Sequence, residues 1–253
     1  MSDFAPEFSG RVALVTGGAR GIGRACCLRL AAGGAQIALN YAANHQAAAE
    51  TKALVEAAGG VCELFQADVG DESAFSAAVS SVRNRLGPIT LFVANAGTTK
   101  ALGHSELTLE IFRETLRVNL EGVFIGIQQV KSDMLAQGGG SIVCLSSIAA
   151  FRPRARQIDY AAAKAGVVAM MRCYAEALAP DIRVNAVAPG LTETDMIGGL
   201  DQDLLPSRRS AIPLKRFGQA VEIGEAVAFL LSDRAAFITG HTLVVSGGDV
   251  MEP

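Results

Sequence analysis

The sequence predicts an α/β fold, in which one doubly wound parallel sheet of about seven strands carries helices on both faces. Short β-branched runs alternate along the chain with longer alanine-rich segments of helical period. The strand segments are apolar without alternation, as expected where helices cover both faces of a parallel sheet. Strands that alternate with helices also imply right-handed crossovers, which are the usual connections in such a sheet.

The first half of the chain supplies the first four strands and the helices between them. The first strand precedes a glycine-rich turn, and the helix after it has Ala25, Leu28 and Leu30 among its apolar positions. The same alternation then repeats. In chain order, the expected elements are strand 11–16, helix 23–32, strand 36–40, helix 44–58, strand 61–67, helix 72–86 and strand 91–94.

The second half supplies the last three strands. It begins with a long helical stretch, and three glycines at 138–140 stand where a helix should end. In chain order, the expected elements are helix 107–128, strand 141–145, helix 160–178, strand 182–187, helix 221–231 and strand 243–245. Because we find neither a linker nor an internal repeat, we expect a single domain over residues 1–253.

Composition excludes several classes of protein. The formal net charge is −3, with 22 Lys and Arg against 25 Asp and Glu, so we expect neither nucleic acid nor an anionic membrane as partner. The N-terminal ten residues include Asp3 and Glu7 and lack the apolar region of a secretory signal. No run reaches the roughly 18 apolar residues of a membrane span.

The cysteines and histidines indicate neither disulfides nor a metal. None of the five cysteines forms a C-x-x-C pair, which favours free thiols in a reducing cytoplasm. His45, His104 and His241 lie far apart without the spacing of metal ligands, so we expect no metal site.

The turn after the first strand is the first candidate functional segment. Strand 11–16 leads into a helix through Thr16-Gly17-Gly18-Ala19-Arg20-Gly21-Ile22-Gly23. Glycines there let the backbone approach a dinucleotide pyrophosphate, whose charge meets the helix N-terminus. The spacing T-G-x-x-x-G-x-G differs from the general G-x-G-x-x-G fingerprint. The turn predicts a Rossmann-type dinucleotide site, with an ordinary strand-to-helix turn as the alternative.

The end of the second strand predicts which dinucleotide binds. NAD-binding proteins place an Asp or Glu there to hold the ribose 2′-hydroxyl. Here Asn40 and Tyr41 follow Leu39, and no acid appears before Glu50. Asn40 does not repel a 2′-phosphate, and Arg20 could bind one through a charge-assisted fork, unless its side chain is merely solvated. We therefore expect NADP(H) in preference to NAD(H).

A tyrosine, a lysine and a serine suggest acid–base chemistry. Tyr160 and Lys164 are four residues apart at the start of a helix, so their side chains share one face. A neighbouring cation lowers the pKa of a phenol from about 10 toward neutrality. Ser147 follows strand 141–145, at the carboxyl edge where ligands bind in open α/β sheets, and its hydroxyl could hold a carbonyl oxygen. Alone, a Tyr–Lys pair of this spacing is more often a surface pair.

Together these motifs resemble the short-chain dehydrogenase/reductase family over about residues 10–248. Ser147 stands thirteen residues before Tyr160, as is usual in that family. The matching motifs are Thr16–Gly23, Asn95-Ala96-Gly97, Asn119, Ser147, Tyr160-x-x-x-Lys164 and Pro189-Gly190. The motif before Asn95 departs from the family, which often has a second Asn where this chain has Ala94.

The resemblance implies roles for the matching residues. Tyr160 would exchange a proton with the carbonyl or alcohol oxygen, and Ser147 would orient and stabilise that oxygen. Lys164 would bind the nicotinamide ribose and lower the pKa of Tyr160, while Asn119 would hold a proton-relaying water. Asp68 would contact the adenine and Thr194 the carboxamide. Further cofactor contacts would come from Gly17, Arg20, Gly21, Ile22, Gly23, Asn40, Val69, Asn95, Ala96, Gly97, Tyr160, Lys164, Pro189, Gly190 and Thr192. Relatives are commonly homotetramers built around helices 107–128 and 160–178 and the last strand.

Within the family the chain is most similar to reductases of 3-oxoacyl-(acyl-carrier-protein) and of acetoacetyl-CoA, through residues 188–196 and 238–245. This similarity implies NADPH-dependent reduction of a 3-oxoacyl thioester, as in fatty acid biosynthesis. A secondary-alcohol or polyol dehydrogenase is the alternative. The carrier-protein reductases tend to have basic docking residues where this chain has Gly138 and Asp181, which weakens the case for an acyl carrier protein as partner.

Two further segments bear on the substrate. Arg152, Arg154 and Arg156 lie between Ser147 and Tyr160 and could bind a phosphate or carboxylate, although a solvated basic loop is the alternative. Residues 191–213 have the composition of a substrate lid, in which Leu200, Leu204, Leu205 and Ile212 would cover an apolar substrate or pack into the core.

Two classes other than an enzyme remain. A nucleotide-sensing protein that has lost its chemistry would break the Ser–Tyr–Lys set, which is intact here. A structural or interaction module would need neither the glycine turn nor that set.

Overall fold

A computed structural model describes residues 6–194 and 202–251 and contains one seven-stranded parallel sheet. The strand order is β3-β2-β1-β4-β5-β6-β9, which confirms the predicted doubly wound topology. A separate pair of two-residue strands, β7 and β8, lies outside this sheet. The strands are β1 Val12–Val15, β2 Gln36–Tyr41, β3 Val61–Gln66, β4 Ile89–Ala94, β5 Gly140–Leu145, β6 Ile182–Pro189, β7 Thr192–Glu193, β8 Gly218–Gln219 and β9 Thr242–Val245.

Helices follow the strands in the order that the sequence predicts. The described helices are α1 Gly21–Ala32, α2 His45–Ala57, α3 Glu72–Leu86, α4 Leu109–Leu116, α5 Gly122–Ala136, α6 Ile158–Ala177, α8 Leu205–Ala211 and α9 Ala220–Leu231. Side-chain caps fix several of their starts: Asn44, Asp71 and Thr108 each accept a hydrogen bond from the backbone N–H three residues later. Gly87, at φ 100°, ends α3 where the sequence predicts.

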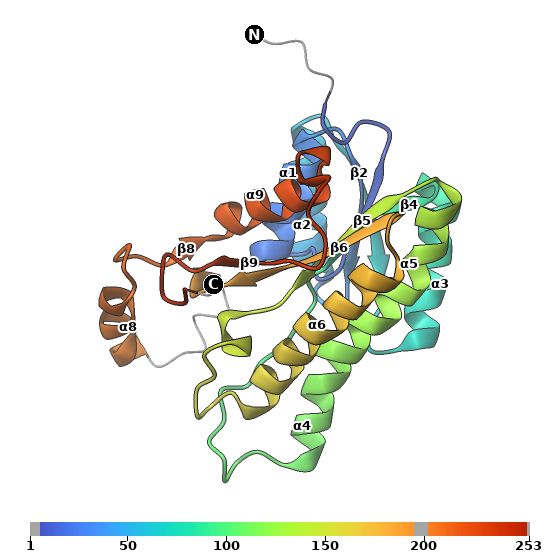
Figure 1. Cartoon of the computed structure of the whole chain (residues 1–253). Helices are drawn as coiled ribbons and strands as arrows, with labels where there is room; N and C mark the ends of the chain where they lie inside the picture. Colours follow the sequence, from blue (N-terminus) through green and yellow to red (C-terminus); the bar gives the residue numbers. More distant parts are fainter. Residues whose placement is uncertain (1–5, 195–201, 252–253) are drawn as a thin grey trace.

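Two apolar cores cover the two faces of the sheet (Figure 1). Helices α1, α2 and α9 pack on one face, and α3, α5 and α6 pack on the other. Strand β1 shows why its sequence does not alternate: Ala13 and Val15 face the first core, while Val12 and Leu14 face the second. The central strands β1 and β4 are almost wholly apolar because both of their faces are buried, whereas the edge strand β3 contains Glu63 and Gln66.

The helical stretch predicted at 107–128 is interrupted. Helix α4 passes through a π-helical turn at Arg117–Glu121 into α5, which continues to Ala136. Gly138, at φ 75°, follows the end of α5, and the N–H of Gly139 returns to the carbonyl of Met134. The wider ring of a π turn shifts the side chains after it, and Asn119 lies within this turn.

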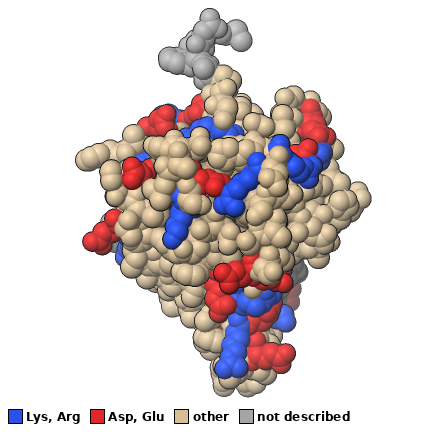
Figure 2. All heavy atoms as spheres, turned by 90° about the vertical axis from the view of Figure 1, so that its right-hand side faces the viewer, with Lys and Arg blue, Asp and Glu red and all other residues tan. Residues whose placement is uncertain are grey.

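The sequence did not predict β7, β8 or α8. Each is short, with two residues in β7 and β8 and seven in α8, so none carries a full period of hydrophobic residues. Among the described residues no helix has the length and apolarity needed to cross a membrane. On the face shown in Figure 2, acidic and basic side chains are interspersed.

Candidate active site

The glycine turn between β1 and α1 forms a backbone cradle at the carboxyl edge of the sheet. Gly17 and Gly21 have φ of 64° and 54°, which favour glycine. At Gly23 a Cβ atom would lie 2.1 Å from the carbonyl oxygen of Gly17. Arg20, the residue before α1, has extended backbone and no side-chain capping bond, so the first N–H groups of the helix remain for an anion. The cradle therefore fits a pyrophosphate.

Thr16 and Asn95 join this turn to the loop after β4. The Thr16 hydroxyl accepts hydrogen bonds from the N–H groups of Asn95 and Ala96, at 2.9 and 3.0 Å. The Asn95 amide donates to the carbonyls of Thr16 and Gly17, at 2.8 and 3.1 Å. Because β1 and β4 are neighbours at the topological switch point, the two motifs meet there.

At the adenine end of the expected cofactor site, the Asn40 side chain points into the protein. Asn40 is 1% exposed, and both hydrogens of its amide bind backbone carbonyls, those of Phe65 and Ala67. Its side chain therefore ties β2 to β3. No carboxylate lies in β2, and the nearest later acid, Glu50, accepts a hydrogen bond from Arg24 at 3.3 Å.

Asp68, the expected adenine contact, is paired with an arginine that the sequence did not single out. Nη2 of Arg117 lies 2.8 Å from Oδ2 of Asp68, and the Gly70 N–H donates to Oδ1 at 2.9 Å. These contacts lower the pKa of Asp68, the Arg117 hydrogen bond most. A Cβ at position 70 would collide with the Arg117 side chain. The glycine at this position was therefore the one feature of the sequence that pointed to a side chain packed against it.

Eleven of the predicted site residues line one cavity of about 180 Å³ at the carboxyl edge of the sheet. All four expected catalytic residues are among them. The eleven are Ile22, Asn95, Gly97, Asn119, Ser147, Tyr160, Lys164, Pro189, Gly190, Thr192 and Thr194. The other predicted residues, Gly17, Arg20, Gly21, Gly23, Asn40, Asp68, Val69 and Ala96, do not line it.

Tyr160 and Ser147 face each other in this cavity. Burial raises the pKa of Tyr160 above its usual value, and a hydrogen bond with Ser147 opposes that shift. Desolvation thus outweighs the Ser147 hydrogen bond, and the lowering of the Tyr160 pKa that the resemblance implied for Lys164 is not found. The Ser147 hydroxyl also accepts a hydrogen bond from the Ala149 N–H at 3.1 Å, which fixes its position at the start of a 3₁₀ turn, Ile148–Ala150.

Lys164 is buried behind Tyr160, with its ammonium 5.7 Å from the centre of the phenol ring. The ammonium donates to the Leu145 carbonyl at 2.8 Å, which anchors α6 to the end of β5. Burial lowers the pKa of Lys164 to about 8, while Cys144 opposes this. A lysine so placed can gain or lose a proton close to neutral pH.

We expect this buried lysine to make stability depend on pH. Since the folded pKa of about 8 lies below the unfolded value of 10.5, the unfolded chain binds more protons between those pH values, and stability rises with pH there. Relative to Lys164→Met, the free energy of unfolding of the wild type should rise by about 2 kcal/mol from pH 7 to pH 9.5. Urea titrations of both proteins at the two pH values measure this. Parallel curves would contradict it.

Asn119 is held by the loop that follows β4. Its amide nitrogen donates to the carbonyls of Thr98 and Thr115, at 2.8 and 2.9 Å, and its oxygen accepts from the Thr98 N–H at 3.3 Å. A Cβ on Gly97 would lie 2.7 Å from that oxygen and 3.6 Å from Nζ of Lys164. Gly97 therefore leaves the space between Asn119 and Lys164 open.

Several further residues of the site were missed by sequence reasoning. Thr115 donates to the buried carboxylate of Asp159 at 2.6 Å, which joins α4 to the residue before Tyr160. The cavity is also lined by Gln157 and Asp249, which come from segments that carry no family motif. Only proximity in the fold identifies them.

The predicted lid, 191–213, is described only in part. Leu200 lies outside the described residues. Leu204 is 45% exposed, whereas Ile212 is 1% exposed and therefore packs in the interior. Leu191 and Arg208 line the cavity from this segment.

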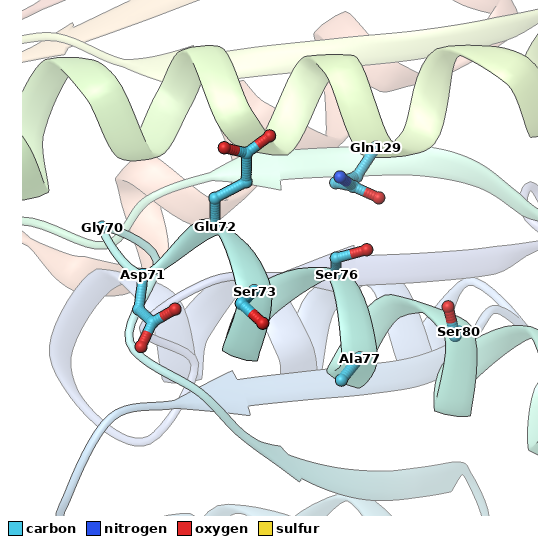
Figure 3. A pocket seen from close by; sticks show the side chains of 8 residues that line it. All are labelled: Gly70, Asp71, Glu72, Ser73, Ser76, Ala77, Ser80 and Gln129. Carbon is cyan, nitrogen blue, oxygen red and sulfur yellow. The ribbon is translucent and has the colours of Figure 1, made fainter.

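A second hollow lies between α3 and α5, lined by Gly70, Asp71, Glu72, Ser73, Ser76, Ala77, Ser80 and Gln129 (Figure 3). The Asp71 carboxylate already caps α3 through the Ala74 N–H, at 3.0 Å. The lining contains serines but neither a lysine nor a histidine to activate one. This hollow does not carry the chemistry of the first cavity.

The chain is similar to known reductases over most of its length. A family model described as enoyl-(acyl carrier protein) reductase matches residues 17–249. A 3-oxoacyl-[acyl-carrier-protein] reductase of Staphylococcus epidermidis is 39% identical over 240 residues, which cover 94% of this chain and 98% of that protein. An acetoacetyl-CoA reductase of Rhizobium meliloti shows the same identity and coverage.

A crystal structure from Sinorhizobium meliloti, provisionally assigned as a short-chain alcohol dehydrogenase, superposes with a TM-score of 0.92 at 34% sequence identity. The match covers 97% of this chain and 98% of that one.

Proposed function

This chain belongs to the short-chain dehydrogenase/reductase family, and on that premise we propose that it is an NADPH-dependent reductase of a 3-oxoacyl thioester. That it is an oxidoreductase follows from the family. The observation that supports the finer proposal most is the one cavity shared by Ser147, Tyr160, Lys164 and Asn119.

The cofactor site of the proposal runs along the carboxyl edge of the sheet. The glycine cradle would hold the pyrophosphate, and Thr192 and Thr194 would hold the nicotinamide end in the cavity. The nicotinamide supplies the hydride when bound. Arg20, at the first turn of α1, would bind the 2′-phosphate, and the lack of a carboxylate in β2 removes the repulsion that NAD-selective sites present to that phosphate.

Within the cavity the side chains would divide the chemistry. The Ser147 hydroxyl would hold the ketone oxygen, and Tyr160 would donate its proton to that oxygen as negative charge develops. The raised pKa of Tyr160 keeps the phenol protonated and ready to donate. Lys164, at a pKa of about 8, would serve as the source of the next proton for Tyr160.

The acyl carrier in the proposal is coenzyme A in preference to a carrier protein. Gly138 and Asp181 precede β5 and β6, at the amino edge of the sheet, opposite Ser147. Neither residue offers positive charge to an acidic carrier protein. A secondary-alcohol dehydrogenase is the second candidate, favoured by the name of the structural neighbour from Sinorhizobium meliloti.

We further propose a homotetramer in a reducing cytoplasm. Phe124 and Leu135 of α5 are 48% and 47% exposed, which suits a helix face that a second copy covers. All five cysteines are free, as expected in a reducing compartment.

The first experiment measures NADPH and NADH oxidation side by side with acetoacetyl-CoA. Rapid turnover with NADPH alone supports the proposed substrate and cofactor. If the protein binds NADPH but does not reduce acetoacetyl-CoA, the proposed thioester substrate is wrong. Secondary alcohols with NADP⁺ are then tested.

We expect Arg20→Ala to weaken NADPH by about tenfold or more and NADH by less than about twofold, since a charge-assisted pair with the 2′-phosphate exists only in NADPH. KM values for both cofactors measure this. The control is Arg113→Ala, which removes the same positive charge from an exposed position on α4. Equal losses for NADPH and NADH would show that Arg20 does not contact the 2′-phosphate.

A further inference from the structure

Arginines from two segments far apart in the sequence line the catalytic cavity. Arg152 and Arg154 come from the turn between Ser147 and Tyr160, and Arg208 comes from α8. Asp249, near the C-terminus, is the one acidic residue in the described lining. The cavity also contains the buried Lys164, so positive charge exceeds negative charge around it.

The contacts of these arginines separate them into two kinds. Nη1 of Arg152 binds both the carboxylate and the carbonyl of Asp249 at 3.0 Å, and the Asp249 side chain is only 5% exposed. Arg152 is therefore neutralised by a partner. Arg156 does not line the cavity, because its Nε donates to the Ala101 carbonyl at 2.8 Å.

Arg154 and Arg208 are different. Within residues 6–194 and 202–251, neither guanidinium group has a hydrogen bond or an ion pair with another protein group. The neighbouring Arg209 packs over the Phe217 ring at 5.0 Å. Of the two adjacent arginines of α8, only Arg208 therefore lines the cavity. The lining thus holds two guanidinium groups whose charge nothing in the described chain balances.

Such an arrangement suits an anion. A guanidinium group presents a planar fork of N–H donors that matches a carboxylate or a phosphate. Two like charges on one cavity repel each other less when an anion lies between them. The same cavity holds Ser147 and Tyr160, so a molecule whose carbonyl reaches them shares that cavity with both guanidinium groups.

We propose that Arg154 and Arg208 form an anion subsite, which binds a carboxylate or phosphate group of the substrate while its ketone lies at Ser147 and Tyr160. This inference rests on the proposed function, since it assigns a charge to the substrate of that site. The phosphate would come from the pantetheine arm of a coenzyme A thioester, and the carboxylate from a small free keto acid.

The test compares anionic and neutral ketones of the same core. Acetoacetate is paired with ethyl acetoacetate, and acetoacetyl-CoA with acetoacetyl-N-acetylcysteamine. The variants are Arg154→Gln, Arg208→Gln and the double variant, and Arg156→Gln removes the same charge from the same turn as a control. We expect the double variant to raise KM for an anionic substrate by about tenfold or more, with its neutral counterpart changed less than about twofold.

The pair that responds identifies the anion. A response limited to acetoacetate assigns a carboxylate, and one limited to acetoacetyl-CoA assigns a phosphate. The subsite is overturned if anionic and neutral substrates lose equally, if neither pair responds, or if Arg156→Gln has the effect of the double variant.

A binding measurement separates failure of the subsite from failure of the proposed function. Calorimetry on the NADP⁺-loaded protein, which has no hydride to give, records the affinity for acetoacetate and for free coenzyme A without turnover. If the wild type reduces no ketone, about tenfold weaker binding of either probe to the double variant still supports the subsite. Equal affinity in wild type and double variant overturns it, whatever the turnover.

Discussion

Replacing Tyr160 with Phe should lower kcat for ketone reduction by about a thousandfold or more, while the affinity for NADPH changes less than about twofold. The variant keeps the ring that packs near Lys164 and removes only the hydroxyl that would donate the proton. General acid catalysis of this kind contributes about 10²- to 10⁴-fold. Steady-state kinetics with acetoacetyl-CoA, together with NADPH titration, measure both quantities.

Tyr174→Phe is the matched control for this variant. Tyr174 lies on the same helix, outside the catalytic cavity, and its hydroxyl accepts a hydrogen bond from the Gln128 amide at 2.7 Å. We expect that control to keep kcat within about twofold of the wild type, because its hydroxyl contributes only one partly buried hydrogen bond away from the cavity. Substantial activity of Tyr160→Phe would rule out the phenol as proton donor.

Gly23→Ala should weaken NADPH binding by about a hundredfold or more. A Cβ there would lie 2.1 Å from the carbonyl oxygen of Gly17 and 2.7 Å from the Asn95 amide nitrogen, so the turn must open. Two backbone hydrogen bonds to a charged pyrophosphate, at roughly 1.5 kcal/mol each, account for that loss. Calorimetric titration of NADPH measures it, and thermal unfolding shows whether the variant remains folded.

Gly59→Ala distinguishes a local collision from the general effect of losing a glycine. Gly59 also has a positive φ, 82°, but nothing lies within 4 Å of its absent Cβ. That variant should lose about 1 kcal/mol of stability and bind NADPH like the wild type. If Gly23→Ala also bound NADPH normally, the cradle would not be the pyrophosphate site.

The sequence by itself determined the α/β class, the alternation of elements and the position of most of them. Helix α3 matches its prediction at both ends, since its Asp71 cap and terminal Gly87 are local signals. The central strands could be recognised because burial on both faces makes them mostly apolar. The family motifs further predicted Asn119, Ser147, Tyr160 and Lys164, and the structure brings all four to one cavity.

Only the tertiary structure decided how side chains far apart in sequence balance one another. It turned the Asn40 amide inward to β3, paired Asp68 with Arg117, and placed Asn119 in a π turn. It also raised the pKa of Tyr160 although a lysine lies four residues away, because desolvation depends on what surrounds the phenol. Of the three arginines between Ser147 and Tyr160, it neutralised Arg152, bound Arg156 to the Ala101 carbonyl, and placed Arg154 in the lining of the cavity that Arg208 also lines. Periodicity reports which face of an element is buried, whereas charge balance and burial depend on the segments that pack against that face, and the fold alone brings those together.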